Sequence, residues 1–259
     1  MILENIQNNM INTIFNENCL ETMKRMPDNY IDLTVTSPPY DNLRTYNWYS
    51  WDFEWIAKEL FRVTKEWWVV VWIVWDQTKN FCETMTSMKQ AFFFWNLWFN
   101  LLDTMFYYKQ NYSPAYPTLR RYANQFEYMY VFSKGKPKTF NPVQRDKVRN
   151  KEEKVWFRQQ DWTIIRKLKG KWRETKDASN VWEYAVWGNL SWHPAVFPEK
   201  LAEDHILSWS NPLDIVYDPF MWSWTTAKMA ILNARHFIWS EVSEEYCRIA
   251  QERISNHIK

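Results

Sequence analysis

The chain has 259 residues, of which 46% are hydrophobic and 24% charged, and its formal net charge is +2. This length suits one globular domain with an insertion, because it is rather long for a single minimal core. No apolar run is long enough to span a membrane, and the polar amino-terminal residues are unlike a signal peptide. The three cysteines lack a C-x-x-C spacing. They therefore indicate a reducing cytoplasm rather than a disulfide framework or a zinc site.

Apolar patterns predict alternating strands and helices along the chain. In chain order we expect a strand at 31–36, a helix at 55–64, a strand at 69–74, a helix at 84–97 and strands at 99–108 and 126–132. A helix at 199–207, a strand at 215–217, a helix at 225–233, a strand at 236–240 and a helix at 244–254 follow. The strands at 99–108 and 126–132 resemble a closing antiparallel pair. This alternation predicts an α/β fold, in which helices cover both faces of a mostly parallel twisted sheet.

Positive charge is concentrated in one segment. Between Lys109 and Lys176 there are 18 Lys and Arg against 6 Asp and Glu, a local charge of +12, whereas the rest of the chain carries −10. A basic segment on an acidic body is typical of an insertion that binds phosphate groups. A solvated, partly disordered loop would have the same composition, so charge alone leaves nucleic-acid binding open.

Glycine and tryptophan occur at unusual frequencies. The chain has 3 glycines and 19 tryptophans, whereas glycine normally makes up about 7% of a protein. Trp67 and Trp68 precede the apolar run at 69–74, where a tight turn would favour glycine. Trp222 and Trp224 occupy a strand-to-helix turn, where the backbone must approach a ligand closely.

We interpret 15 of the 19 tryptophans as standing where functional relatives have glycine. The four exceptions are Trp51, Trp72, Trp182 and Trp209, whose neighbours suit an aromatic residue. With these replacements the chain would have 18 glycines, close to the usual frequency. The codon TGA is read as tryptophan in some genetic codes and as glycine in others, so TGA is predicted at the 15 positions and TGG at the other four. A deliberately substituted or decayed sequence is the alternative.

The first motif with chemical content, Thr36-Ser37-Pro38-Pro39-Tyr40, directly follows a predicted strand. The exocyclic amine of a nucleic-acid base is a poor nucleophile, because its lone pair is delocalised into the ring. Ser37 offers a side-chain acceptor for one amine proton, and the rigid peptide carbonyl of Pro38 offers a second. Tyr40 offers an aromatic face for an extruded base. A purely structural Pro-Pro loop would look the same.

A second motif follows the predicted strand at 215–217 and reads Asp218-Pro219-Phe220-Met221-Trp222-Ser223-Trp224-Thr225-Thr226. With glycine at positions 222 and 224, backbone N–H groups could approach an anionic ligand group at a helix N-terminus. As written, the two indoles would fill the space that the ligand needs. A well-capped helix without a ligand is the alternative. Glu241 ends the next predicted strand, where acidic side chains bind ribose hydroxyls in nucleotide-binding folds.

Together these motifs resemble the permuted (beta) group of S-adenosylmethionine-dependent amino-methyltransferases, in which the catalytic motif precedes the cofactor motif. Residues 37–40 match the family's S/D/N-P-P-Y, and residues 218–226 match its cofactor loop apart from the two tryptophans. The segment at 193–198, which contains His193, Ala195 and Phe197, resembles the one that packs on the methionine end of the cofactor. Residues 16–21 resemble N-G-D-C-L-E, which implies that Asn18 and Cys19 lie near the cofactor adenine.

The resemblance implies a Rossmann-like methyltransferase fold with an inserted DNA-recognition region. It divides the chain into a catalytic half at 1–109, closing strands plus a target-recognition insertion at 110–190, and a cofactor-binding half at 191–259. The basic segment falls in the middle part. The residues expected to contact DNA there are Arg120, Arg121, Tyr116, Lys134 and Lys136.

The implied reaction moves a methyl group from S-adenosylmethionine to the exocyclic amine of cytosine (N4) or adenine (N6) in double-stranded DNA, with the base flipped toward Tyr40. Neither a metal nor a covalent enzyme intermediate is needed. Ser37 in place of Asp favours cytosine N4, with adenine N6 close behind. The rival interpretation is a catalytically inactive DNA-binding relative, if Trp222 and Trp224 are real. A homodimer and a cognate restriction nuclease are both compatible with the resemblance.

Overall fold

A computed structural model describes residues 10–39, 52–111, 120–146, 154–159, 161–168, 175–185, 198–220 and 225–257. The chain divides into two compact units, one formed by residues 1–141 with 180–259 and the other by residues 142–179. Within the described ranges, no helix is long and apolar enough to cross a membrane, and no three His, Cys, Asp or Glu side chains gather as ligands for a metal ion.

The first unit is built around an eight-stranded sheet. Its strands are β1 (Thr13–Phe15), β2 (Ile31–Thr36), β3 (Thr64–Val74), β6 (Asn100–Lys109), β7 (Phe126–Ser133), β12 (Val181–Tyr184), β13 (Ile215–Asp218) and β14 (His236–Ser240). Their spatial order is β1-β14-β13-β2-β3-β7-β6-β12, and of these strands β7 alone runs antiparallel to its neighbours. The predicted mostly parallel α/β fold and the predicted antiparallel pair are therefore confirmed.

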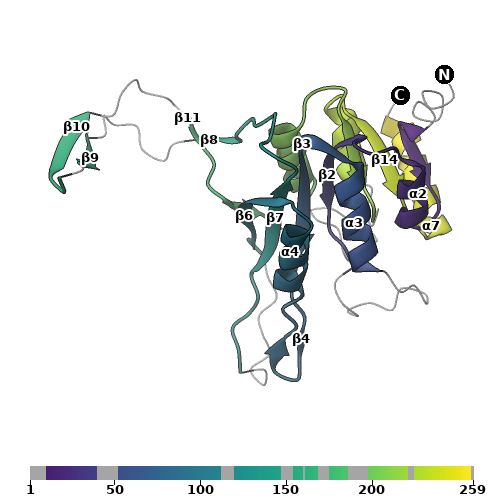
Figure 1. The fold of residues 1–259 in the computed structure, drawn as a ribbon, viewed down its shortest axis with the longest axis horizontal. Coiled ribbons are helices and arrows are strands. Elements are labelled where there is room, and N and C mark those ends of the chain that lie inside the picture. The colour runs from purple at the N-terminus through teal and green to yellow at the C-terminus, as the bar shows by residue number, and fades with distance from the viewer. Residues whose placement is uncertain are drawn as a thin grey trace. The chain divides into compact units, whose positions relative to one another are not determined.

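Helices of this unit fall into two groups. The first contains α2 (Cys19–Arg25), α3 (Phe53–Val63) and α4 (Thr86–Asn96), and Figure 1 shows α3 and α4 in front of the sheet. The second contains α5 (Glu199–Trp209) and α6 (Thr225–Leu232), which pack on each other, while α7 (Glu244–His257) contacts β1. Because α3 connects β2 to a strand on one side and α6 connects β13 to a strand on the other, right-handed connections place α3 and α6 on opposite faces.

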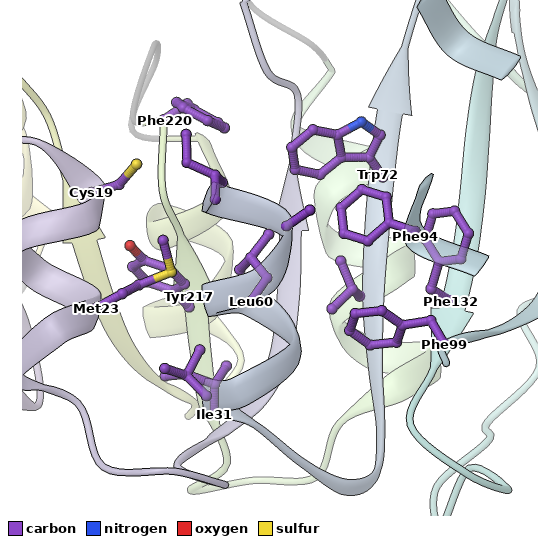
Figure 2. Packing of buried hydrophobic residues seen from close by; sticks show 14 of the residues in the cluster. Cys19, Met23, Ile31, Leu60, Trp72, Phe94, Phe99, Phe132, Tyr217 and Phe220 are labelled. Carbon is purple, nitrogen blue, oxygen red and sulfur yellow. The ribbon is translucent and has the colours of Figure 1, made fainter. Parts of the chain in front are cut away.

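The main apolar core lies between the sheet and the first group of helices (Figure 2). Ile56, Leu60 and Val63 of α3 are fully buried, as their helical spacing predicts. Trp72 of β3 is also fully buried, meets the Phe94 ring edge-on with centroids 5.0 Å apart, and donates from its indole nitrogen to Gln90 at 2.8 Å. A buried indole with a satisfied N–H supports the interpretation of Trp72 as a residue selected for its aromatic ring.

Strand β3 differs from the prediction at its beginning. It starts at Thr64, directly after α3, and Trp67 lies inside it, so the predicted tight turn before residue 69 is wrong. The pairing with β2 shifts instead between Ile31–Thr64 and Leu33–Val69, which leaves extra residues of β3 without a partner in β2, as a bulge. Trp67 has a left-handed backbone with φ 70°. The position therefore favours glycine for a different reason from the one predicted.

The second unit is a pair of small antiparallel ladders. β8 (Gln144–Asp146) pairs with β11 (Thr175–Asp177), and β9 (Lys154–Arg158) pairs with β10 (Ile164–Leu168). This unit lies within the predicted middle part of the chain, residues 110–190, which was expected to contain the closing strands as well as the insertion. The functional division into three parts stays a prediction.

Candidate active site

The two predicted motifs follow neighbouring strands at the point where the connections of the sheet reverse direction. From β2 the chain continues to β3 on one side, and from β13 it continues to β14 on the other. The carboxyl ends of strands at such a switch point are the usual place for a ligand crevice in an open α/β sheet. Tyr217 of β13 lies beside Thr34 of β2, so the residues that follow the two strands come together.

The described part of the catalytic motif consists of Ser37, Pro38 and Pro39. Both prolines are buried and Ser37 is half-buried. The preceding residue, Thr36, is fully buried and donates from Oγ1 to Asp218 Oδ1 at 2.6 Å. This bond joins the catalytic motif to the cofactor motif. Tyr40, the predicted stacking residue, lies outside the described residues.

Asp218 is a buried carboxylate at the end of β13. Its Oδ1 also accepts from the Phe220 N–H at 3.0 Å, and the Thr226 side chain adds a further hydrogen bond. Burial nevertheless raises the pKa of Asp218 to about 7. The Phe220 ring meets Trp72 edge-on with centroids 6.2 Å apart (Figure 2), so the beginning of the cofactor motif is anchored in the apolar core.

The rest of the predicted cofactor motif is described only in part. Pro219 is buried, and Thr225 and Thr226 are each 2% exposed at the start of α6. Trp222, Ser223 and Trp224 lie outside the described residues, as do His193, Ala195 and Phe197.

The helices that follow these two segments are tied together. Lys228 of α6 forms an ion pair of 2.7 Å with Glu199, the first residue of α5. The helix that follows the segment at 193–198 is thus held beside the helix that follows the cofactor motif.

Glu241 directly follows β14, on the side of β13 away from β2. Its Oε1 accepts from the Ser243 N–H at 2.8 Å, and its own backbone is held by Asn16 and Phe15. Burial raises the pKa of Glu241 to about 7, and the charge of Asp218 acts in the same direction. The predicted position at the end of the strand is therefore observed, while its role toward ribose stays a prediction.

Asn18 and Cys19 begin α2. The Asn18 side chain accepts from the Leu20 N–H at 2.9 Å, which makes Asn18 the N-cap of the helix. Cys19 is buried, and burial raises the pKa of its thiol to about 12. Glu17, which the resemblance left unexplained, accepts from the Thr22 hydroxyl at 2.7 Å and pairs with Arg25, so it ties the start of α2 to its end.

The predicted DNA contacts are separated by the fold. Arg120 and Arg121 are exposed just before β7, whose first residues lie at the same edge of the sheet as the end of β3. Arg121 donates to Thr78 in β4 (Thr78–Lys79), which forms a hairpin with β5 (Cys82–Glu83). Tyr116 lies outside the described residues.

Lys134 and Lys136 follow β7 at the opposite edge of the sheet, because Ser133 pairs with Val69. Lys134 is buried, donates to Asn29 at 2.8 Å and pairs with Glu66 at 3.3 Å. Lys136 is exposed. The buried contacts of Lys134 give it a structural role that does not fit the predicted one.

Two polar residues at this edge were missed by the sequence analysis. Thr36 is the first residue of the catalytic motif, but no role was predicted for it. Asp76 follows β3, is 6% exposed, and accepts from the backbone and hydroxyl of Ser87 at 2.8 and 2.5 Å. A polar residue directly after a buried apolar run is the signal that could have identified Asp76, because parallel strands end at one edge.

Two comparisons match the sequence of this chain to known proteins. The DNA methylase family matches residues 31–252. The orphan methyltransferase M.BamHII of Bacillus amyloliquefaciens is 52% identical over 240 residues, which cover 88% of this chain and 90% of that protein.

Solved structures share the fold at lower identity. The cytosine-N4-specific PvuII DNA methyltransferase superposes with a TM-score of 0.67 and 18% identity, covering 90% of this chain and 83% of that one. The M1.HpyAVI–SAM complex superposes with a TM-score of 0.59 and 23% identity, covering 93% and 98% of the two chains. These two structures thus share the fold of this chain.

Proposed function

This chain belongs to the DNA methylase family, and on that premise we propose that it transfers a methyl group from S-adenosylmethionine to the exocyclic amine of cytosine or adenine in double-stranded DNA. One observation carries the proposal. The catalytic motif and the cofactor motif, which lie far apart in the sequence, are joined at the switch point by the 2.6 Å bond between Thr36 and Asp218. Because the catalytic motif comes first in the chain, we assign the enzyme to the permuted group.

The described residues fit a cofactor with hydroxyl and amine donors. Asp218 and Glu241 are buried carboxylates after neighbouring strands, and carboxylate oxygens accept hydrogen bonds from such groups. We propose that Glu241 binds the ribose hydroxyls, that residues 218–226 surround the methionine part together with His193, Ala195 and Phe197, and that Asn18 and Cys19 border the adenine. When bound, S-adenosylmethionine supplies an electrophilic methyl group on a sulfonium sulfur.

We propose that the catalytic motif makes the base amine nucleophilic. Ser37 Oγ and the Pro38 carbonyl accept the two amine protons, which draws the nitrogen lone pair out of conjugation with the ring. The buried prolines hold both acceptors at fixed positions. Pro39 fixes the turn to Tyr40, whose ring stacks on the flipped base. Most of the rate enhancement then comes from positioning and electrostatics.

The DNA partner is recognised, in this proposal, by Arg120, Arg121 and Tyr116, with the basic segment that continues into residues 142–179. The exposed arginines at the carboxyl edge of the sheet support this assignment. The three cysteines of the chain are free in the structure, which suits the cytoplasm that we propose as the place of action. A homodimer and a cognate nuclease remain predictions. Light scattering tests the first, and co-purification tests the second.

We propose cytosine N4 as the target, because Ser37 replaces the aspartate that is more usual with adenine. Adenine N6 is the second candidate. A catalytically inactive DNA-binding relative is the remaining one, and it depends on Trp222 and Trp224 filling the cofactor loop.

Loss of the Ser37 hydroxyl together with the Pro38 ring, which holds the second acceptor, the Pro38 carbonyl, at a fixed position, tests the proposal. In the chain with glycine at the 15 predicted positions, Ser37→Ala together with Pro38→Ala should abolish methyl transfer to DNA while the Kd for S-adenosylmethionine, measured by calorimetry, stays within about threefold. An equal loss of cofactor affinity would contradict the assignment of this motif to the base amine.

A further inference from the structure

The bond between Thr36 and Asp218 lies inside the site rather than at its surface. Thr36 is fully buried and Asp218 is 4% exposed. Thr36 is the last residue of β2 and Ser37 follows it directly, whereas Asp218 is the last residue of β13. The hydrogen bond between them therefore joins the start of one motif to the start of the other.

A second contact reinforces the junction. The Thr226 hydroxyl in α6 lies 3.4 Å from the Val35 carbonyl oxygen of β2, and the Thr226 side chain also bonds Asp218. The carboxylate of Asp218 thus collects donors from β2, from the cofactor motif through Phe220, and from α6. A buried carboxylate is unfavourable unless such donors surround it.

Burial of a charged group at this point has a cost that an apolar residue would avoid. Burial raises the pKa of Asp218 to about 7, and the Thr36 hydroxyl is the first of the hydrogen-bond donors that oppose this rise. Without that hydroxyl, the carboxylate would lose its 2.6 Å partner and its ionised form would be less favoured.

We propose that Thr36 is a positioning residue, whose hydroxyl holds the catalytic motif and the cofactor motif in register through Asp218. The inference rests on the proposed methyltransferase function, since it assigns a task to the same site. Thr36 contacts neither base nor cofactor in this scheme. It fixes the distance between Ser37, which binds the amine, and the loop after Asp218, which surrounds the methyl donor.

The neighbouring Thr34 provides a matched control. It lies two residues earlier in β2, so both side chains point to the same face, and it is also fully buried. Its hydroxyl oxygen has no hydrogen-bond partner among the described residues. Thr34→Val and Thr36→Val make the same chemical change in the same strand, but the second one alone removes the link to Asp218.

The test compares Thr36→Val, Thr36→Ser and Thr34→Val in the full chain with glycine at the 15 predicted positions. We expect Thr36→Val to raise the Kd for S-adenosylmethionine at least about tenfold and to lower kcat by a similar factor, while the KM for DNA stays within about threefold. Thr36→Ser retains the hydroxyl and should keep both constants within about threefold of the parent. Thr34→Val should match the parent.

Three results would overturn the inference. One is a Thr36→Val enzyme whose cofactor Kd and kcat equal those of Thr34→Val. Another is a Thr36→Ser enzyme as impaired as Thr36→Val, which would show that packing of the methyl group matters rather than the hydroxyl. A KM for DNA that rises as much as kcat falls would be the third. Absence of methyl transfer in the parent would instead count against the proposed function.

Discussion

Two buried carboxylates lie at the ends of neighbouring strands, Asp218 as the last residue of β13 and Glu241 directly after β14. Burial raises the pKa of Asp218 from 3.8, and that of Glu241 from 4.5, to about 7. A raised pKa means that the folded protein holds these protons more tightly than the unfolded chain does. The free energy of unfolding contributed by these groups therefore falls as pH rises from about 4 to 7. Two groups that lower stability at neutral pH, at the edge where ligands bind, are typical of a functional site.

Cofactor affinity should depend on pH through Glu241. Hydroxyl donors favour the ionised carboxylate, so cofactor binding should lower the pKa of Glu241. The Kd for S-adenosylmethionine should therefore decrease as pH rises from 6 to 8. Glu241→Gln should weaken binding at pH 8 by about tenfold or more and flatten this dependence, leaving the part that Asp218 contributes. Calorimetry at pH 6, 7 and 8 measures both effects.

The exposed Glu244 at the start of α7 is the control, because Glu244→Gln removes a carboxylate three residues away outside the buried site. Its Kd should follow the parent at each pH. A Glu241→Gln protein with the parent's full pH dependence would contradict the role of Glu241.

Among the helices, the end of α4 shows a tryptophan at a position where a left-handed backbone favours glycine. Phe99 N–H donates to the Phe94 carbonyl at 3.4 Å and Trp98 N–H to that of Trp95 at 3.1 Å, the pattern of a Schellman motif. The Phe94 and Phe99 rings pack with centroids 5.7 Å apart. Trp98 occupies the left-handed position of this motif with φ 71°, and its side chain is 86% exposed.

Trp98→Gly should therefore be more stable than Trp98→Ala by about 1 kcal/mol, although both remove the same exposed indole. The alanine keeps the Cβ that a left-handed backbone disfavours. Urea denaturation of the two variants measures the difference. Equal midpoints and slopes would show that the backbone at position 98 carries no such strain.

The central strands and most helices were predictable because their apolar spacing is set by burial against the sheet. β1 was not predicted, because its three residues are too few to form a pattern. α2 was not predicted either, because its main sequence signal is its N-cap, Asn18. β12 was assigned to the insertion, yet it pairs in parallel with β6 in the main sheet. Its four residues, two of them exposed, have no apolar run that separates them from a loop.

Site residues that lie in a short sequence motif could be predicted, whereas contacts that depend on which strands lie next to each other could not. Asp218 ends a strand, and Ser37 and Glu241 each directly follow one, so their position at one edge follows from a parallel sheet. The link from Thr36 to Asp218 depends on β13 lying beside β2. Lys134 shows the opposite case, because a lysine in a basic segment turned out to be buried against Asn29.

At the scale of the whole chain, the unit formed by residues 142–179 can be tested as a DNA-binding insertion. The two ends of this segment lie next to each other, because the Ala178 N–H donates to the Val143 carbonyl at 2.8 Å and Gln144 pairs with Asp177. Replacing residues 145–176 by Asn-Gly would close this pair with a two-residue turn. The change removes 12 Lys and Arg against 5 Asp and Glu.

We expect this shortened chain to bind S-adenosylmethionine within about threefold of the parent and to bind DNA at least about tenfold more weakly at 0.1 M salt. The slope of log affinity against log salt should also become shallower, because fewer phosphate contacts release fewer counterions. Fluorescence anisotropy with labelled duplex DNA measures affinity and slope. Unchanged DNA affinity would remove the insertion from the proposed DNA-binding surface.

In the proposed reaction, the residues at the ends of β13 and β2 promote transfer of a methyl group from S-adenosylmethionine to a base amine. The most direct test is mass analysis of nucleosides from mixed-sequence DNA incubated with S-adenosylmethionine and either the chain as written or its version with 15 Trp→Gly replacements. We expect N4-methylcytosine, or else N6-methyladenine, from the glycine version, and no methylated base from the chain that keeps Trp222 and Trp224. Unmethylated DNA from both proteins would contradict the claim.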